Sequence, residues 1–225
     1  MLTGLLSDRV LVVEAPVASF GLPSADDARW VAGAVEKRQR EFAAGRAVAR
    51  QALAALGVAP ESCPLPPDAD GVPRWPDGLV GCITHSGGWC AAAVARASAV
   101  RGIGIDGEDL ARLRAERSDP GWLDLVLRPA ERDSLASLSR DEAFRRAIIH
   151  FSAKESFYKC QFPLTRARLD FMDAEVVVSP ERGEFDLECV VPLDGMPRRW
   201  TGRYAVAADR VVTAVELAAG PSQNV

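Results

Sequence analysis

Apolar and polar positions along the N-terminal part of the chain predict one long helix and several short strands. Ser24, followed by an acidic first turn, predicts the start of a helix that runs to Leu56 and is capped by Gly57. Residues 58–78 hold much of the chain's proline and predict a loop. Apolar runs predict strands at residues 8–14, 79–84, 90–96 and 100–108, the second and third joined as a hairpin by a Gly-Gly turn.

The C-terminal part follows the same order of a helix and then strands. Residues 109–121 are charged and predict a mobile connection, whereas residues 122–138 predict helix with a new start at Pro129. A long helix is predicted over residues 141–162, and Pro163 helps to end it. Strands are predicted at residues 172–178, 184–191, 199–207 and 211–217.

This repeated order favours an α+β fold of two pseudo-symmetric α/β halves in one chain, with a site in a concave pocket between them. The halves share no clear sequence identity, so the two-fold rhythm is one of architecture only. The predicted division is an N-terminal half over residues 1–101, a C-terminal half over 102–218 and a tail over 219–225.

The composition excludes several classes of protein. The 225 residues carry a net charge of −4, which argues against binding to nucleic acid or an anionic membrane, so an anionic ligand would need local Arg and Lys. The five cysteines are odd in number and form no CxxC pair, so neither a disulfide framework nor a zinc site is predicted. The lack of a signal peptide and of an apolar run of about 20 residues completes the prediction of a cytoplasmic protein.

The stretch from Phe151 to Lys159 combines a carboxylate and two amines with large apolar side chains. Glu155 and Lys159 are four residues apart and therefore share one face of the predicted helix, with Lys154 beside them. Such a pair is common on helix surfaces, where it contributes only roughly a few tenths of a kcal/mol. Polar clusters elsewhere in the chain favour a functional site over a surface ion pair.

Asp106 and Glu108 end an apolar strand, where alternate side chains point to the same side. Two carboxylates there suit Mg²⁺, which takes one or two carboxylates together with water and phosphate oxygens, although most such pairs are surface carboxylates. His85 precedes a Gly-rich turn, which suits a phosphate contact as well as a turn histidine satisfied by backbone. A solvated face or an anion site would explain the cations of the first helix, Lys37, Arg38, Arg40, Arg46 and Arg50.

Three motifs stand in order along the chain: Thr-His-Ser at 84–86, Gly-Ile-Gly-Ile-Asp-Gly-Glu at 102–108, and Phe-Ser-Ala-Lys-Glu-Ser-Phe-Tyr-Lys at 151–159. Together they resemble the motifs of the 4′-phosphopantetheinyl transferases, in the larger, monomeric Sfp/EntD-like class. Lys-Arg-Gln-Arg-Glu-Phe at 37–42 and Trp-Pro-Asp-Gly at 75–78 extend the resemblance upstream. Phe-Pro-Leu-Thr at 162–165 is similar to the EntD-like branch, and to actinobacterial members in particular.

The resemblance implies the fold of that family and a reaction that moves 4′-phosphopantetheine from coenzyme A to a serine of a carrier protein, releasing 3′,5′-ADP. Glu155 would take the serine proton, directly or through a water, and Lys159 would stabilise the bridging or leaving phosphate oxygen. Mg²⁺, with Mn²⁺ as the alternative, would be held by Asp106, Gly107, Glu108 and Glu155. Coenzyme A would contact Arg38, Arg46, Arg74, Thr84, His85, Asp106, Lys154, Glu155 and Lys159.

Two positions depart from the family pattern. Gly107 stands where the family usually has a residue with a side chain. The loop at 64–70 lacks the Lys or Arg that relatives often place on the adenosine phosphate, which makes Arg74 the substitute. The implied partners are apo carrier proteins of polyketide, non-ribosomal peptide or fatty-acid synthases, as in secondary metabolite biosynthesis. A monomer would meet them through a basic or apolar patch around residues 112–135.

Two other functions compete with this interpretation. One is a catalytically silent module that binds coenzyme A or a carrier protein, which the intact set of carboxylates and Lys159 argues against. The other is a metal-dependent phosphohydrolase acting on a small nucleotide, which the lack of further His and Asp clusters disfavours.

Overall fold

The computed structural model describes residues 1–59, 63–116, 121–207 and 209–219. The chain divides into two units, which are treated separately below. The N-unit is Ser7–Ile103 with Glu216–Val225, and the C-unit is Gly104–Val215 with Met1–Leu6. The predicted division between residues 101 and 102 stays a prediction, and most of the predicted tail lies outside the described residues. Among the helices described, none combines the length and the apolar character that a bilayer span requires.

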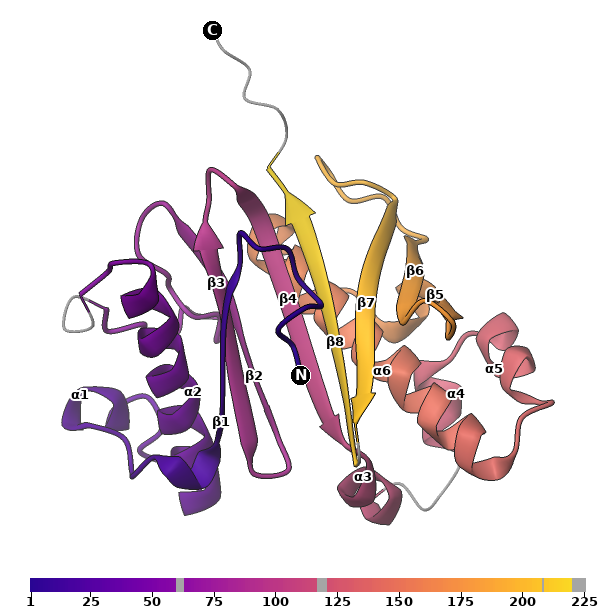
Figure 1. Cartoon of the computed structure of the whole chain (residues 1–225), viewed down its shortest axis with the longest axis horizontal. Coiled ribbons are helices and arrows are strands. Elements are labelled where there is room, and N and C mark those ends of the chain that lie inside the picture. The colour runs from indigo at the N-terminus through magenta and orange to yellow at the C-terminus, as the bar shows by residue number, and fades with distance from the viewer. Residues whose placement is uncertain (60–62, 117–120, 208, 220–225) are drawn as a thin grey trace, which may run out of the picture. The chain divides into compact units, whose positions relative to one another are not determined.

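The N-unit packs one long helix against a three-stranded antiparallel sheet (Figure 1). The sheet order is β1-β3-β2, with β1 at Leu11–Pro16, β3 at Trp89–Arg96 and β2 at Leu79–Ser86. Helix α2, Glu36–Ala55, packs mainly on β3, whose inward side chains are small. The helix therefore comes close to the sheet, and a Cβ added at Gly45 would lie 2.9 Å from the Ile83 side chain.

The predicted helix from residue 24 to 56 is wrong as one element, because the structure divides it. Ser24 does cap a helix, accepting from the Asp27 backbone N–H, but that helix, α1, covers only Ala25–Ala28. Asp27 instead turns to Arg50 of α2 and binds its guanidinium at 2.8 and 2.9 Å. A contact between residues 23 positions apart thus replaces continuation of the helix, whereas the predicted C-cap at Gly57 is confirmed by a φ of +83°.

The C-unit is built on a five-stranded sheet in the order β4-β8-β7-β6-β5, in which β5 to β8 pair antiparallel. Its strands are β4 (Val100–Asp109), β8 (Arg210–Ala218), β7 (Arg199–Ala207), β6 (Glu184–Cys189) and β5 (Ala174–Ser179). The long helix α6, Arg140–Thr165, packs on this sheet, and the rings of Phe157 and Trp200 meet edge to face at 5.1 Å.

Short helices surround α6. They are α3 (Leu110–Glu116), α4 (Trp122–Val126), α5 (Pro129–Leu135) and the 3₁₀ turn η3 (Phe171–Asp173), whereas the 3₁₀ turn η1 (Val17–Ser19) packs on α2 in the N-unit. Pro129 opens α5 as predicted, but the predicted mobile connection over 109–121 contains helix α3, and residues 117–120 lie outside the described part.

The predicted end of the long helix at Pro163 is also wrong. The helix continues to Thr165, and Arg166 closes it in the left-handed region at φ +58°. Pro163 lacks a backbone N–H and so removes one hydrogen bond from α6. Because it lies in the last turn, little helix follows that could be disrupted, and α6 continues for two more residues. Both units hold a long helix against an antiparallel sheet, and the predicted α+β class is confirmed.

Candidate active site

One face of β4 lies directly against the backbone of α6. Gly104, Asp106 and Glu108 alternate along the strand and so share this face. A Cβ added at Gly104 would sit 1.7 Å from the Ser156 carbonyl oxygen, so only glycine allows this approach. The close contact carries the next residue on the same face, Asp106, to side chains of the helix.

Asp106 is buried, with 3% of its surface exposed, and both carboxylate oxygens have partners from α6. Its Oδ2 accepts from the Ser152 hydroxyl at 2.7 Å, and its Oδ1 accepts from Lys159 Nζ at 2.5 Å. Thr213 of β8 donates in turn to the Ser152 carbonyl at 2.8 Å. The structure thus brings Asp106 and Lys159 together as predicted partners of one site.

Ser152 and Thr213 are site residues that sequence reasoning missed. A signal existed for Ser152, because it lies one helical turn before Ser156 and seven residues before Lys159, on the same stripe of α6. No signal in the sequence points to Thr213, which reaches the group only through the pairing of β8 in the sheet.

Glu155 stands between two surfaces of α6. Successive helical residues turn by about 100°, so Glu155 is about 40° from Lys159 on one side and about 60° from Tyr158 on the other. Tyr158 faces a hollow of about 270 Å³, which Glu155 also lines. The other lining residues are Lys154, Phe157, Leu169, Asp170, Phe171 and Ala174. Glu155 therefore borders both the stripe that meets Asp106 and a largely apolar hollow.

The oxygen donors of β4 fit a hydrated Mg²⁺ better than a metal enclosed by protein ligands. In the described parts of the chain, no group of three or more His, Cys, Asp or Glu side chains is arranged to hold a metal ion. The expected trio of Asp106, Glu108 and Glu155 is thus not preassembled, and Asp106 is paired with Lys159 instead. Two carboxylates on one strand face match the one or two that Mg²⁺ takes, so the metal roles of these residues and of Gly107 stay predictions.

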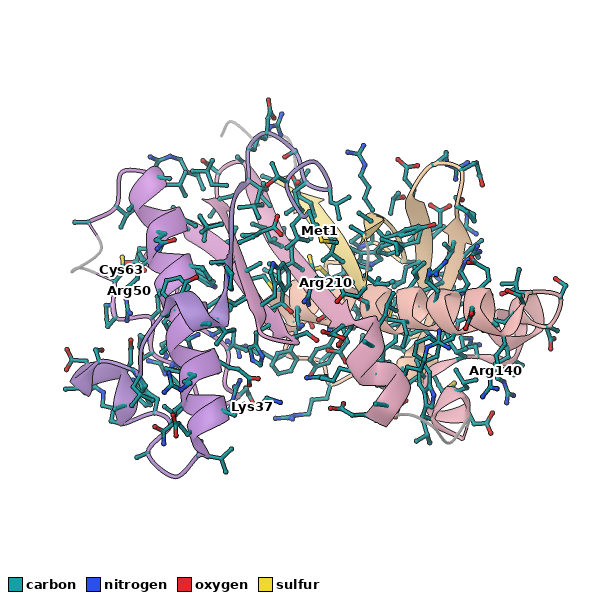
Figure 2. All side chains as sticks on the ribbon, turned by 60° about the horizontal axis from the view of Figure 1, so that its bottom comes forward. Met1, Lys37, Arg50, Cys63, Arg140 and Arg210 are labelled. Carbon is teal, nitrogen blue, oxygen red and sulfur yellow. The ribbon has the colours of Figure 1, made fainter. Side chains whose placement is uncertain are left out.

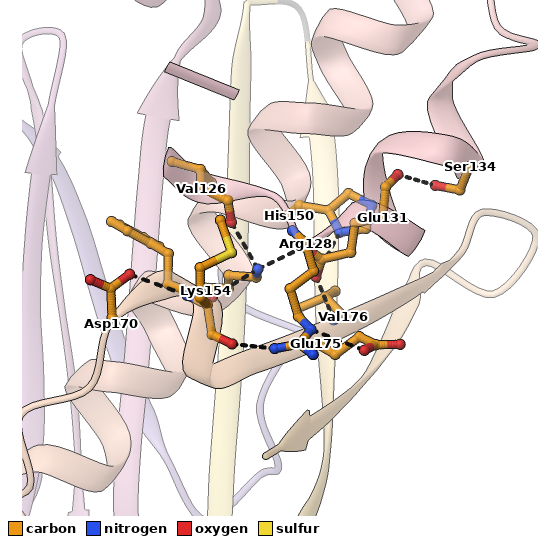
Figure 3. A network of polar contacts seen from close by, with 11 residues as sticks. Val126, Arg128, Glu131, Ser134, His150, Lys154, Asp170, Glu175 and Val176 are labelled. Carbon is orange, nitrogen blue, oxygen red and sulfur yellow. Dashed lines mark hydrogen bonds and ion pairs between the residues drawn. The ribbon is translucent and has the colours of Figure 1, made fainter. Parts of the chain in front are cut away.

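Lys154 lies in a different place from the one expected. It is about 140° around the helix from Lys159, and its side chain is 2% exposed. Its three ammonium protons go to the carbonyls of Val126 and Phe171, at 2.8 and 3.0 Å, and to Glu131 Oε2 at 2.7 Å (Figure 3). The predicted contact of Lys154 with coenzyme A stays a prediction, and this geometry disfavours it because every donor is already used.

Glu131 is the buried partner of Lys154 and was not found from the sequence. Burial raises the pKa of this carboxyl, but His150 and Lys154 outweigh burial and hold its pKa below the usual value. His150 Nδ1 lies 3.6 Å from Glu131 Oε1, beyond ordinary hydrogen-bond length, so the ring acts on the carboxylate electrostatically, as a close polar neighbour. Glu131 is therefore an ionised group inside the protein, stabilised by its neighbours.

In the N-unit, Arg38 and His85 form the second group of predicted residues. Arg38 Nη1 donates to His85 Nε2 at 2.6 Å, which leaves the ring proton on Nδ1, facing Glu41 at 3.6 Å. Thr84 is buried, and because neighbours on a strand point to opposite faces, it does not share the face of His85. The structure thus joins Arg38 with His85 but separates Thr84 from them.

Two further cations of α2 hold the proline-rich loop. Arg46 is buried, stacks on Phe42 at 4.4 Å and donates to the Leu65 carbonyl at 2.8 Å, and burial lowers its pKa to about 10. Arg50 donates to the Cys63 carbonyl at 3.1 Å, and Figure 2 labels these two residues side by side. The arginines therefore hold backbone carbonyls of the loop, whatever else they bind.

Arg74 is exposed on the far part of this loop. It lines a hollow of about 400 Å³ together with Arg29, Trp30, Asp68, Ala69 and three prolines of the loop. The guanidinium of Arg29 lies over the Trp30 ring at 5.1 Å. Two cations at one hollow are suited to an anion, which supports Arg74 as the predicted substitute in this loop.

Comparison with known proteins covers both parts of the chain. A family profile described as the 4′-phosphopantetheinyl transferase N-terminal domain matches residues 26–95, and one described as the 4′-phosphopantetheinyl transferase superfamily matches residues 102–215. The 4′-phosphopantetheinyl transferase Svp of Streptomyces mobaraensis is 42% identical over 92% of this chain and 83% of its own length. PptT of Mycobacterium tuberculosis is 37% identical over 87% of this chain and 86% of its own length. Npt of Nocardia iowensis is 38% identical over 84% of this chain and 86% of its own length.

Among solved structures, the chain is similar to a holo-(acyl-carrier-protein) synthase of Bacillus anthracis, with a TM-score of 0.40 and 18% identity. That match covers 54% of this chain and 99% of the synthase, which was solved in complex with CoA (3′,5′-ADP).

Proposed function

This chain belongs to the 4′-phosphopantetheinyl transferase superfamily, and from that premise we propose how its own residues carry out the transfer. The oxygen of a serine on an apo carrier protein attacks the phosphorus that carries pantetheine in coenzyme A. The new serine–phosphorus bond forms, the bond to the adenosine-side phosphate breaks, and 3′,5′-ADP leaves. The observation that carries the proposal is the contact of Asp106 with Lys159, beside Glu155, where β4 touches α6.

Two side chains of α6 take the chemical roles. Glu155 accepts the serine proton, directly or through one water, as the oxygen attacks. Lys159, whose side chain is 28% exposed, stabilises the negative charge that develops on the phosphate oxygens. Asp106 and Glu108 are the residues that would hold Mg²⁺, which supplies charge neutralisation for the pyrophosphate when bound.

The hollow beside Glu155 suits the pantetheine arm. Its walls are largely apolar, with Phe171 and Leu169 among them, and the arm is a thin chain of methylenes and amides. Because Glu155 lines this hollow, an arm lying there would place its phosphate end close to the proposed base.

The adenosine part of coenzyme A is assigned to cations of the N-unit. Arg38 and His85 already contact each other, and the exposed Arg74 lines the hollow beside the loop. Arg46 contributes by holding the loop at Leu65 and by its charge, and Thr84 stays a candidate from the motif alone. A 3′-phosphate would gain charge-assisted hydrogen bonds from these guanidinium groups.

The carrier proteins we propose are those of polyketide, non-ribosomal peptide or fatty-acid synthases, modified in the cytoplasm by a monomer as part of secondary metabolite biosynthesis. What supports this is the family resemblance. The predicted docking patch around residues 112–135 falls partly outside the described residues.

The test is incubation with coenzyme A, Mg²⁺ and a panel of apo carrier proteins, read by intact-protein mass. We expect one phosphopantetheine to be added to a carrier serine, and Asp106→Ala to abolish the addition. A silent binding module would add nothing to any carrier. A phosphohydrolase would release 3′,5′-ADP without a carrier, and either result would overturn the proposal.

A further inference from the structure

A network of charged groups, shown in Figure 3, makes hydrogen bonds to the backbone of the segment that lines part of the hollow beside Glu155. At its centre, Glu131 has a side chain that is 1% exposed, and its two oxygens take three hydrogen bonds. Oε1 accepts from the Val176 backbone N–H at 2.7 Å, and Oε2 accepts from the Arg128 backbone N–H and from Lys154 Nζ, both at 2.7 Å. One carboxylate thus joins the start of α5, the edge strand β5 and helix α6.

The network reaches the hollow through backbone carbonyls. Lys154 donates to the Phe171 carbonyl at 3.0 Å, and Arg128 donates to the next carbonyl, that of Met172. Glu131 binds the N–H of Val176, two residues after Ala174, which also lines the hollow. The segment from Phe171 to Val176 is therefore held at three backbone points, all leading back to Glu131 or its neighbours.

The positions of Lys154 and Glu131 indicate a role in shaping the hollow in addition to any contribution to stability. A buried ion pair often contributes no more than well-packed apolar residues would, so burial of Lys154 with Glu131 needs another explanation. Lys154 is itself a lining residue, and it is the chain neighbour of Glu155. The pair connects the wall of the hollow to the helix that carries the proposed base.

We propose that Glu131 is a positioning residue, which acts through Lys154 to keep the Phe171–Val176 wall of the hollow in the shape that receives the pantetheine arm of coenzyme A. The proposal rests on the proposed function and names the part of the substrate that this wall meets. Glu131 itself touches neither the substrate nor the reacting atoms. Its influence is on binding of the arm, and it leaves the adenosine part unaffected.

The test compares two ligands that differ by that arm and by the phosphate that carries it. Coenzyme A and 3′,5′-ADP share adenosine with its 3′- and 5′-phosphates, but only coenzyme A carries the second phosphate of the pyrophosphate and the pantetheine. Titration calorimetry in Mg²⁺ buffer gives both dissociation constants for the wild type and for Glu131→Gln. We expect Glu131→Gln to weaken coenzyme A binding about tenfold, which corresponds to the loss of one or two hydrogen bonds, and to leave 3′,5′-ADP binding within about twofold.

Two further variants test whether the effect is specific to Glu131 and independent of an unpaired buried charge. Glu131→Gln combined with Lys154→Met removes both charges together, so no unpaired charge remains buried, and the same selective loss is expected from it. Glu184→Gln is the matched control, because Glu184 on β6 binds Arg182 at 3.2 Å, and neither residue belongs to the Phe171–Val176 wall or lines the hollow. We expect it to leave both dissociation constants unchanged.

The outcomes separate this inference from the proposed function. Folded Glu131 variants that keep the wild-type preference for coenzyme A over 3′,5′-ADP would overturn the inference alone, as would equal weakening of both ligands. A wild-type protein that binds neither ligand would overturn the proposed function and this inference with it.

Discussion

The two long helices, α2 of the N-unit and α6 of the C-unit, use their cations differently. On α2, Arg46 and Arg50 both turn to the same proline-rich loop and hold its carbonyls. On α6, Lys154 turns to a buried carboxylate and two carbonyls, whereas Lys159 turns to Asp106. The difference teaches that a cation near a predicted site is informative only when its face of the helix is known. Of these four, Lys159 alone contacts a carboxylate of the β4 motif.

The largest effect that we expect comes from removing, in each unit, the cation that pairs with a buried carboxylate. Lys154→Met leaves Glu131, 1% exposed, without its counter-charge, which costs about 3–5 kcal/mol in the free energy of unfolding. Arg50→Met leaves the buried Asp27 without its counter-charge. Because Arg50 is 25% exposed, water can replace part of its contacts, so we expect a loss of about 2 kcal/mol in the free energy of unfolding. Urea unfolding of both variants measures the difference. Equal losses in the free energy of unfolding would contradict the claim that the more deeply buried pair, Lys154 with Glu131, depends more on its counter-charge.

Glycine provides the second comparison, because each unit has one where the long helix meets the sheet. Gly104→Ala places a Cβ 1.7 Å from a backbone oxygen of α6, so we expect a loss of about 3 kcal/mol. Gly45→Ala brings its Cβ to 2.9 Å from the Cγ2 methyl of Ile83, so this β-branched side chain must shift, at a cost of about 1–2 kcal/mol, against a gain of about 1 kcal/mol in helix propensity. Its stability should therefore stay within about 1 kcal/mol of wild type. Denaturant midpoints at unchanged m-value provide the measurement.

Much of the C-unit site is predictable from the sequence. The order of the motifs points to Asp106 and Lys159, and the structure joins them within one unit. The different orientation of Lys154 was also accessible, since the helical period alone turns it about 140° away from Lys159. The motif at 151–159 suggested that both Lys154 and Lys159 contact the substrate. The helical period supports a shared face with Glu155 for Lys159 and not for Lys154.

Other features depend on contacts that no local pattern contains. Glu131 finds partners 23 and 45 residues away, in Lys154 and Val176. The break between α1 and α2 has a similar cause, because Asp27 pairs with Arg50 across 23 residues. Local signals such as the Ser24 cap and the Gly57 C-cap were right, but they describe only the ends of elements.

The smallest effect concerns Arg46, where charge and loop support can be separated. Arg46→Lys keeps the positive charge but loses the Nε–H that Leu65 accepts and the stacking on Phe42. If holding the loop is its main role, the KM for coenzyme A rises about fivefold with little change in kcat, since one hydrogen bond contributes about 1 kcal/mol. Steady-state kinetics against coenzyme A measure this. An unchanged KM would mean that charge alone matters at this position.

The most direct test of the central claim, that the contact of β4 with α6 forms a transfer site, is the rate at which Glu155→Gln modifies an apo carrier protein. Intact-protein mass gives the rate, and urea unfolding of the same preparation gives the stability. Because the change keeps the shape of a half-buried side chain and removes only its basicity, we predict a rate at least about 100-fold below wild type and a free energy of unfolding within about 1 kcal/mol. Transfer at the wild-type rate by a folded Glu155→Gln protein would contradict the assignment.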